Sequence, residues 1–404
     1  MSSRYRPPFT AGLLLLLTIV VYVPWVHYAS ARPSAPAVAD FAPTYTSLEA
    51  AERIATAQAA ERPLLQQHAL TPLLPPVPTV YFSQTGHHLS NRSGFLDFWR
   101  SNGQVLLFGY PITEEFVENG RVVQYFERAR FEYHPEFLGT SWQVKLGLIG
   151  RELTQERDFG TLPDDPQTGV RYFPETQHTL WGKFGRYWER RGDADIFGYP
   201  ISEEFEEEGR IVQYFERARF EYHPEDMDWF YRSHEQYYGI TLNTLHEVVV
   251  SDIGRQLALM RGINTAPVPP LAGAAEWSPG LWSRHIAINL SSQQLTAYED
   301  DLPVYHAPIA TGRDGFNTPA GNFAVYDKLR MQTMQGSAGG ESWYVPNVPW
   351  VMYVVGGVAL HGTYWHNHFG SGLRMSHGCI NLDMDDAEWL YTWAAIGTTV
   401  QIHY

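Results

Sequence analysis

Residues 361–381 read HGTYWHNHFGSGLRMSHGCIN and contain Cys379, the only cysteine of the 404-residue chain. A thiol attacks a carbonyl carbon as the thiolate, and a free cysteine, with a pKa of about 8.5, needs a base or a positive charge beside it. His361 can take the proton and pair with the thiolate as an imidazolium. The base needs an acceptor on its other ring nitrogen, and the carbonyl of Gly362 can serve. This stretch therefore predicts a cysteine nucleophile with a histidine base.

The backbone before the cysteine can complete such a site. Gly378 leaves the chain uncrowded, so the amides of His377, Gly378 and Cys379 can converge on an oxyanion. Ser376 is expected to support the same loop. Two other interpretations are a buried structural thiol and a zinc cluster of the thiol with the nearby histidines. Packing explains a cysteine in a His-rich and Gly-rich loop poorly, and a zinc ion would consume the nucleophile. We therefore expect neither a metal nor a cofactor.

The spacing of these residues resembles the signature of the L,D-transpeptidase catalytic family, which rebuilds bacterial peptidoglycan. The resemblance covers about residues 281–404. It rests on His361, then 14 residues, then Ser376-His377-Gly378-Cys379-Ile380-Asn381. Supporting matches are Thr311-Gly312, Thr318-Pro319-x-Gly321-x-Phe323, and Trp365 four residues after the histidine.

The resemblance implies a β-sandwich catalytic domain with Cys379 as nucleophile, His361 as base and the Gly362 carbonyl orienting that base. It also implies a reaction. The thiolate attacks the carbonyl of the third stem residue of a tetrapeptide donor, and D-Ala leaves. The side-chain amine of a second stem's third residue then resolves the thioester.

The resemblance also implies a cleft and a lid. Trp365 and Asn381 match positions that line the family's cleft, and residues 327–347 correspond to the lid over the acyl site. From the residues alone, Trp365 fits a core position equally well. His377 either supports the loop or tunes the thiolate, and the sequence leaves both roles open.

The other signals in this part of the chain are those of strands. Apolar residues alternate at 286–288, 295–297 and 304–309. Asp383 can cap a helix that follows the nucleophile. We therefore expect a mostly β chain. Residues 281–404 should form an L,D-transpeptidase-type β-sandwich with one helix after the nucleophile, preceded by two small α+β repeat modules.

An internal duplication identifies the two repeats. Residues 108–136, FGYPITEEFVENGRVVQYFERARFEYHPE, recur at 197–225 with four differences in 29 positions. The motif Ile149-Gly150-Arg151-x-Leu153 recurs at residue 253, at an offset of 104 instead of 89, which places an insertion in the second copy around residues 229–241. We predict repeat module 1 at residues 79–160 and repeat module 2 at 168–262.

Alternating runs around Asn119-Gly120 and Glu208-Gly209 predict a hairpin in each module. The many aromatic residues of the modules can form their cores or present a binding surface for a glycan or another wall polymer. Their inward pattern favours core packing. The Phe-Gly-Tyr-Pro segments at 108–111 and 197–200 loosely resemble the Leu-Gly-Phe-Pro repeats of bacterial envelope proteins.

The composition of the segments that flank the modules predicts a leader and two linkers. Residues 1–31 combine Arg4 and Arg6, an apolar run and a small-x-small site, which predicts a signal peptide or an uncleaved membrane anchor. Residues 32–78 read as an Ala/Pro-rich linker with a short helix, and 263–280 as a Pro-rich linker. The rest of the chain is therefore expected outside the cytoplasm, in the cell envelope.

The net charge of −15 has the wrong sign for binding phosphate backbones, so nucleic acid is not an expected partner. We interpret the chain as an exported L,D-transpeptidase that forms 3→3 peptidoglycan crosslinks, with stem peptides as partners: a tetrapeptide donor and an amine acceptor. Alternatives with the same acyl-enzyme are an L,D-carboxypeptidase and a wall-anchoring transferase. A non-catalytic wall-binding protein is the alternative from another class.

Overall fold

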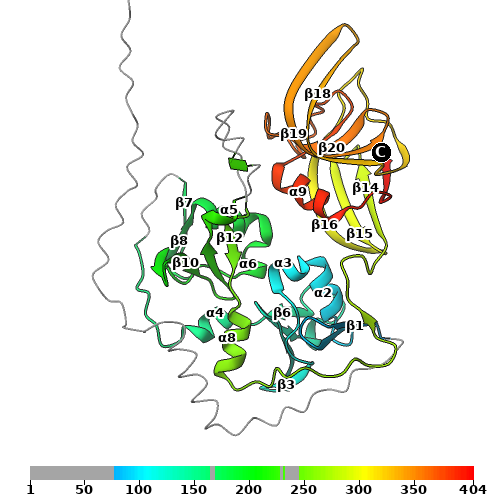
Figure 1. Ribbon diagram of the computed structural model, residues 1–404. Coiled ribbons are helices and arrows are strands. Elements are labelled where there is room, and N and C mark those ends of the chain that lie inside the picture. The colour runs from blue at the N-terminus through cyan, green and yellow to red at the C-terminus, as the bar shows by residue number, and fades with distance from the viewer. Residues whose placement is uncertain (1–76, 164–168, 228–230, 233–244) are drawn as a thin grey trace, which may run out of the picture. The chain divides into compact units, whose positions relative to one another are not determined.

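The structure is a computed structural model that describes residues 77–163, 169–227, 231–232 and 245–404 (Figure 1). The predicted leader at 1–31, nearly all of the predicted linker at 32–78 and most of the predicted insertion at 229–241 lie outside these ranges. Within the ranges, no helix combines the length and the apolar character needed to cross a membrane.

The C-terminal strands form one nine-stranded sheet with the order β17-β22-β14-β15-β16-β21-β20-β19-β18. Its strands are β14 (Arg284–Asn289), β15 (Gln294–Glu299), β16 (Leu302–Ala310), β17 (Gly321–Ala324), β18 (Asp327–Ala338), β19 (Glu341–Val355), β20 (Val358–Gly362), β21 (Ile380–Leu382) and β22 (Thr399–His403). Residues from both halves of the sheet share one apolar core, so the sheet curls around it. The predicted mostly β class is confirmed, and the sandwich takes the form of one continuous sheet.

One helix, α9 (Met384–Trp393), follows the last short strand of the site. The carboxylate of Asp383 accepts a hydrogen bond from the amide of Asp385, which makes Asp383 the predicted N-cap. Ala387 and Leu390 are fully buried in the core of the sheet. The helix therefore covers the core directly after β21.

The two repeats contain matching elements. The first copy consists of β1 (Thr79–Phe82), β2 (His87–Ser90), α2 (Phe95–Ser101), α3 (Gln104–Phe108), β3 (Phe116–Glu118), β4 (Arg121–Tyr125), β5 (Arg130–Tyr133), η1 (Pro135–Phe137), β6 (Val144–Leu146) and α4 (Ile149–Leu153). The second consists of β7 (Val170–Phe173), β8 (His178–Trp181), α5 (Gly182–Arg191), α6 (Asp193–Ile196), β9 (Phe205–Glu207), β10 (Arg210–Tyr214), β11 (Arg219–Tyr222), η2 (Pro224–Asp226), β12 (Val248–Val250) and α8 (Ile253–Met260).

The predicted hairpins are present in both copies. Asn119 and Gly120 join β3 to β4 with φ angles of 50° and 78°, and Glu208 and Gly209 join β9 to β10 with 53° and 77°. Two successive positive φ angles match the twist of a two-residue hairpin. Each copy then continues into a four-stranded antiparallel sheet, β3-β4-β5-β6 or β9-β10-β11-β12.

The aromatic residues of the repeats are mainly core residues. Trp99 and Trp188 are buried at 0% and 3% exposure, and each indole donates to a glycine carbonyl ten residues later in its own copy. Phe131 and Phe220, on β5 and β11, are fully buried at the centres of the two aromatic clusters. These side chains are therefore not available as stacking platforms for a glycan.

Residues 263–280, predicted as a linker, pack against the first repeat instead. The strand β13 (Ala275–Glu276) pairs in parallel with β1, and the ring of Trp277 stacks on Phe82 at 5.6 Å. The amide of Leu271 donates to Nε2 of the buried His88. Composition alone suggested a spacer because the prolines hide the short strand and its single aromatic anchor.

Each repeat also carries an exchanged arm, residues 149–159 in the first copy and 253–263 in the second, which packs on the other copy, although Ile149 and Glu152 of the first arm also contact their own copy. Ile253 and Leu257 are buried with Phe116 and Val123 of the first copy. Leu153 and Phe159 pack on the cluster around Val212 and Tyr214 of the second. The sequence suggested two self-contained modules, because a repeated motif does not reveal which copy it packs against.

The arms dock through their repeated Ile-Gly-Arg motifs. The amide of Gly150 donates to the carbonyl of Glu216 at 3.0 Å, and the amide of Arg255 donates to the carbonyl of Glu127 at 2.9 Å. Arg151 and Arg255 form ion pairs with Glu216 and Glu127, respectively. The two exchanges thus use equivalent residues in both directions.

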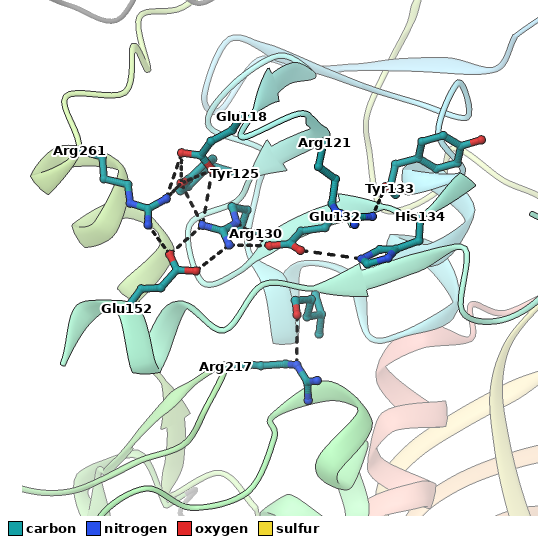
Figure 2. A network of polar contacts seen from close by, with 11 residues as sticks. Glu118, Arg121, Tyr125, Arg130, Glu132, Tyr133, His134, Glu152, Arg217 and Arg261 are labelled. Carbon is teal, nitrogen blue, oxygen red and sulfur yellow. Dashed lines mark hydrogen bonds and ion pairs between the residues drawn. The ribbon is translucent and has the colours of Figure 1, made fainter. Parts of the chain in front are cut away.

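A buried polar network lies beneath one arm (Figure 2). Arg130 on β5 bonds both carboxylate oxygens of Glu152 at 2.8 Å, and Arg261 of the other copy's arm pairs with Glu152 and with Glu118. The phenol of Tyr125 joins them. In the second copy, Arg157 takes the place of Arg261. It contacts Glu207 and Tyr214 there. Arg130 is buried, whereas Arg261 and Glu152 are partly exposed, so the network adds specific ion pairs between the arm and its acceptor sheet.

We expect Gly254→Ala to destabilise the fold by about 1–3 kcal/mol, because a Cβ there would lie 2.2 Å from the carbonyl oxygen of Phe126. Urea unfolding of the purified full chain measures this change. Gly185→Ala, inside α5, is the control: the added methyl group meets only ordinary contacts at 3.6 Å, and alanine favours a helix. Equal stability of Gly254→Ala and the unaltered chain would contradict the arm exchange.

Candidate active site

The pairing of β20 with β21 brings the predicted base and nucleophile together. These strands run in parallel, with Leu360 opposite Ile380 and His361 opposite Asn381. Side chains alternate along a strand, so Cys379, one residue before β21, faces the same side as His361. The backbone of Ala359, beside His361 on β20, contacts the thiol directly. The two predicted catalytic side chains are therefore near neighbours on one face.

The imidazole of His361 has a defined orientation. The residue is 2% exposed, and its Nδ1 lies 3.0 Å from the carbonyl oxygen of Gly362. A carbonyl oxygen only accepts hydrogen bonds, so Nδ1 carries the proton and Nε2 keeps its lone pair. Nε2 is thus the nitrogen that can accept a proton.

Two hydroxyl groups brace the loop that carries Cys379. Oγ of Ser376 donates to the carbonyl of Cys379 at 2.6 Å and accepts from the amide of Gly378 at 3.1 Å. Oγ1 of the buried Thr318 donates to the Gly378 carbonyl at 2.8 Å and accepts from the amide of Gly312 at 2.9 Å. Thr318 and Gly312 belong to the supporting motifs, which gives those motifs a structural role.

The same contacts change the predicted oxyanion hole. The amide of Gly378 is occupied by Ser376, so it is not free for a substrate oxygen in this conformation. The φ angle of Gly378 is 120°, a value that residues with a Cβ rarely adopt. Of the three predicted amides, those of His377 and Cys379 remain as candidate donors.

The surroundings of the thiol are apolar. Cys379 is partly exposed and packs against Val348, Val351 and Ala359, and its Sγ is 3.8 Å from the carbonyl of Gly357. Burial raises the pKa of the thiol, and a hydrogen bond with the Ala359 backbone partly opposes this rise. The thiolate is therefore disfavoured before substrate binds.

Burial also lowers the pKa of His361 to about 4, against the hydrogen bond to Gly362, which raises it. Nearby His366 lowers it further. The resting pair is therefore a neutral thiol beside a neutral imidazole. The thiolate–imidazolium pair considered from the sequence is disfavoured because both charged forms lose solvation on burial.

The two predicted cleft residues differ in exposure. Trp365 is 41% exposed, with its ring 5.8 Å from that of His361, so it is not a core residue. Asn381 is 2% exposed, and its amide nitrogen lies 2.9 Å from Nε2 of His366. Trp365 can thus form a wall beside the base, whereas the side chain of Asn381 is buried and is hydrogen-bonded to His366.

The predicted lid is a long hairpin of β18 and β19, closed by the turn at Gly339 and Gly340. The ring of Trp343 on β19 stacks on His377 at 4.3 Å. Arg313 donates to Nε2 of His377 at 3.0 Å, which shows that His377 accepts there and supports the loop. The sequence analysis missed Arg313 and Trp343. Arg313 directly follows a matched motif, but the hairpin itself matches none.

Among the described residues, no group of three potential metal ligands includes Cys379. Their one group of three potential ligands within ligand distance is His223, Glu225 and Asp226, in the second repeat, where Glu225 already pairs with Arg210. The histidines near Cys379 are engaged separately. His361 bonds Gly362, His366 bonds Asn381 and His377 bonds Arg313.

Comparison with known proteins finds similarity in this part of the chain. Residues 283–402 match the family model of the YkuD L,D-transpeptidase catalytic domain, which confirms the resemblance stated from the sequence. The chain is 29% identical over 142 residues to the probable L,D-transpeptidase ErfK/SrfK of Escherichia coli, covering 31% of this chain and 45% of that protein. It is 31% identical over 99 residues to the probable L,D-transpeptidase 3 of Mycobacterium tuberculosis, covering 23% and 36%.

Among solved structures, the catalytic domain of the E. faecium L,D-transpeptidase is 28% identical, with a TM-score of 0.28, and the match covers 30% of this chain and 98% of that one. The chain spans less than half the length of the curated relatives named above. The match therefore concerns the catalytic domain, and the repeats lie outside it.

The low pKa of His361 predicts a pH-dependent stability. Above pH 6.5 the histidine is neutral in both the folded and the unfolded chain. Between pH 6.5 and about 4 the unfolded chain binds a proton that the folded chain does not, so stability falls as the pH falls. We expect this histidine to account for a loss of about 3 kcal/mol by pH 4.

Urea unfolding of the unaltered chain and His361→Asn at pH 7 and pH 4 tests this. Because asparagine does not titrate, the variant should gain stability relative to the unaltered chain at the lower pH. A stability difference that is the same at both pH values would show that the histidine titrates normally.

Proposed function

We propose that the chain is a cysteine L,D-transpeptidase that forms 3→3 crosslinks in peptidoglycan. The observation that carries this proposal is the pairing of β20 with β21, which sets Cys379 beside His361 in a domain that matches the L,D-transpeptidase family. The transpeptidase class follows from the family. The acyl-enzyme, the crosslink and the residue roles are our inference.

In the first half of the proposed reaction, Nε2 of His361 takes the thiol proton as Sγ of Cys379 attacks the carbonyl carbon of the third stem residue. The new S–C bond forms a tetrahedral oxyanion, which the amides of His377 and Cys379 can stabilise. The C–N bond to D-Ala then breaks, and His361 returns its proton to the leaving amine. A thioester remains.

In the second half, the side-chain amine of an acceptor stem attacks the thioester carbon. His361 accepts a proton from this amine, the C–S bond breaks, and the thiolate recovers the proton. The carbonyl of Gly362 keeps Nδ1 protonated throughout, so one nitrogen handles each transfer. The exposed ring of Trp365 lies beside this path and can pack on the stem peptide.

We also propose that the protein works outside the cytoplasm, where its substrate is assembled into the wall. The proposal rests on the basic and apolar leader at residues 1–31. The repeats, whose aromatic side chains are mainly buried, then separate this leader from the catalytic domain along the sequence. Protease accessibility of the repeats in intact spheroplasts would test the location, and protection from protease would contradict it.

Incubation of the purified full chain with disaccharide-tetrapeptide should yield dimers in which two units have joined with loss of one D-Ala. Mass spectrometry distinguishes the possible products. Tripeptides without dimers would show that water resolves the thioester and would make the protein a carboxypeptidase. Unchanged substrate would contradict both activities.

A carbapenem should add covalently to the thiol, because its strained amide offers a carbonyl to the same nucleophile. We expect intact-mass analysis to show one added inhibitor on the full chain and none on Cys379→Ala. Ser371→Ala, a change at an exposed position of the same segment, is the control and should still be modified. An adduct on Cys379→Ala would place the nucleophile elsewhere.

A further inference from the structure

The lid hairpin, formed by β18 and β19, lies against residues 376–379, the loop that carries Cys379 and is called the nucleophile loop below. The two meet at a charged contact that the proposed reaction does not use. The carboxylate of Glu341, the first residue of β19, forms an ion pair with Arg313. Its Oε2 lies 3.6 Å from Nε2 of His377. The guanidinium of Arg313 donates to that same nitrogen at 3.0 Å. One carboxylate from the lid therefore lies against a cation and an imidazole beside the nucleophile loop.

Arg313 and His377 are positioned independently of the lid carboxylate. The amide of Arg313 donates to the carbonyl of Ser376 at 3.0 Å. Ser376 precedes Cys379 by three residues, so this bond attaches the backbone of Arg313 to the nucleophile loop. The guanidinium lies over the ring of Phe316 at 4.8 Å. The same ring meets His377 edge to face at 4.8 Å. The ring of Phe316 thus contacts both groups and helps to orient them.

The carboxylate of Glu341 is held much less firmly. Its side chain is 51% exposed and stands beside the turn of the hairpin. Contact with Arg313 and His377 lowers the pKa of this carboxyl, so it is ionised at neutral pH. Since exposed ion pairs contribute little to stability, another carboxylate can displace it at small cost.

A second arginine of this region provides a contrast. Arg374 donates to the Gly312 carbonyl at 2.6 Å and to Asp314 at 2.8 Å, and it also bonds Asn317. All of these partners lie in one local segment, so this guanidinium acts as a brace. Arg313 differs because its carboxylate partner comes from the lid.

We propose that Arg313, which also donates to His377, forms a carboxylate-binding subsite for the donor peptide, and that Glu341 of the lid occupies this subsite until substrate displaces it. The planar fork of an arginine suits a carboxylate, and the subsite is next to the loop that carries Cys379. This inference rests on the proposed function. The shared chemistry is a free carboxylate close to the scissile bond. It is either the terminal carboxylate of D-Ala or the side-chain carboxylate of a third stem residue that carries one.

The displacement also affects the lid. Glu341 and Trp343 are two contacts of the hairpin with the nucleophile loop. Trp343 lies across Gly336 on the neighbouring strand, where a Cβ would come within 2.2 Å of the indole. When a substrate carboxylate takes the place of Glu341, the ion pair is lost and the stack on His377 remains. Donor binding therefore removes one contact of the lid and leaves the stack on His377 in place.

Binding to the full chain carrying Cys379→Ala tests the subsite without any turnover. The probes are the disaccharide-tetrapeptide, its D-Ala amide, and the tetrapeptide amidated at the carboxylate of the third residue. Calorimetry should show that one amidation weakens binding about 10-fold, which identifies the carboxylate concerned. Equal affinity for all three peptides, or no binding of any, would overturn the proposal.

Two variants in the same background have opposite expected effects. Arg313→Gln should weaken binding of the free acid about 10-fold and abolish the difference between acid and amide. Glu341→Gln should strengthen binding of the free acid by about 3- to 10-fold, because the competing carboxylate is gone. Arg330→Gln removes the same charge from another position of the hairpin and should leave the acid-to-amide ratio unchanged.

The outcomes separate this subsite from the proposed function. If Arg313→Gln weakens acid and amide equally, or Glu341→Gln weakens binding of the acid, the subsite is wrong even where the unaltered chain makes crosslinks. If the carbapenem adduct and the crosslinks fail but the acid-to-amide ratio still depends on Arg313, the reaction is wrong and the subsite stands. Near-ultraviolet circular dichroism of each variant checks that the fold is intact.

Discussion

The parallel pairing of β20 with β21 is the constraint on which the candidate site depends. A parallel pair needs a crossover, because the second strand must begin at the same end as the first. Here the connecting residues 363–379 make that crossover without a helix. The segment between the strands is therefore also the segment that carries His366, His377, Trp365 and the proposed nucleophile, Cys379. A change in the register of this pair would separate the base from the thiol.

Burial and bracing act together on this pair. Thr318 and Ser376 hold the nucleophile loop through backbone groups, so the thiol is positioned by residues that carry no charge. The apolar surroundings favour the neutral forms of both Cys379 and His361. In the proposed reaction the charges appear only as the substrate carbonyl is attacked, and the low local polarity then strengthens their interaction with nearby donors. A neutral resting thiol is also less easily oxidised than a thiolate.

The repeats show how a duplication can be used structurally. Each copy supplies an arm that completes the core of the other, and both arms dock through a glycine that approaches a backbone carbonyl too closely for any Cβ. The near identity of residues 108–136 and 197–225 follows this arrangement, because each copy must offer the same acceptor surface to the other's arm. Arg157 and Arg261 of the arms add ion pairs with Glu207 and Glu118 of the other copy, and these pairs are again equivalent in the two directions.

The sequence by itself determined the features that depend on local chemistry. The turns at Asn119-Gly120 and Glu208-Gly209, the helix cap at Asp383, the strand pattern and the identity of the catalytic family could all be predicted, because short segments with defined spacing encode them. Only the tertiary structure decided that the Pro-rich segment pairs with β1 and that the arms exchange. It also decided that Ser376 accepts a hydrogen bond from the Gly378 amide and that Glu341 forms an ion pair with Arg313. These contacts join residues whose separation along the chain carries no periodic signal, so they exist only once the chain has folded.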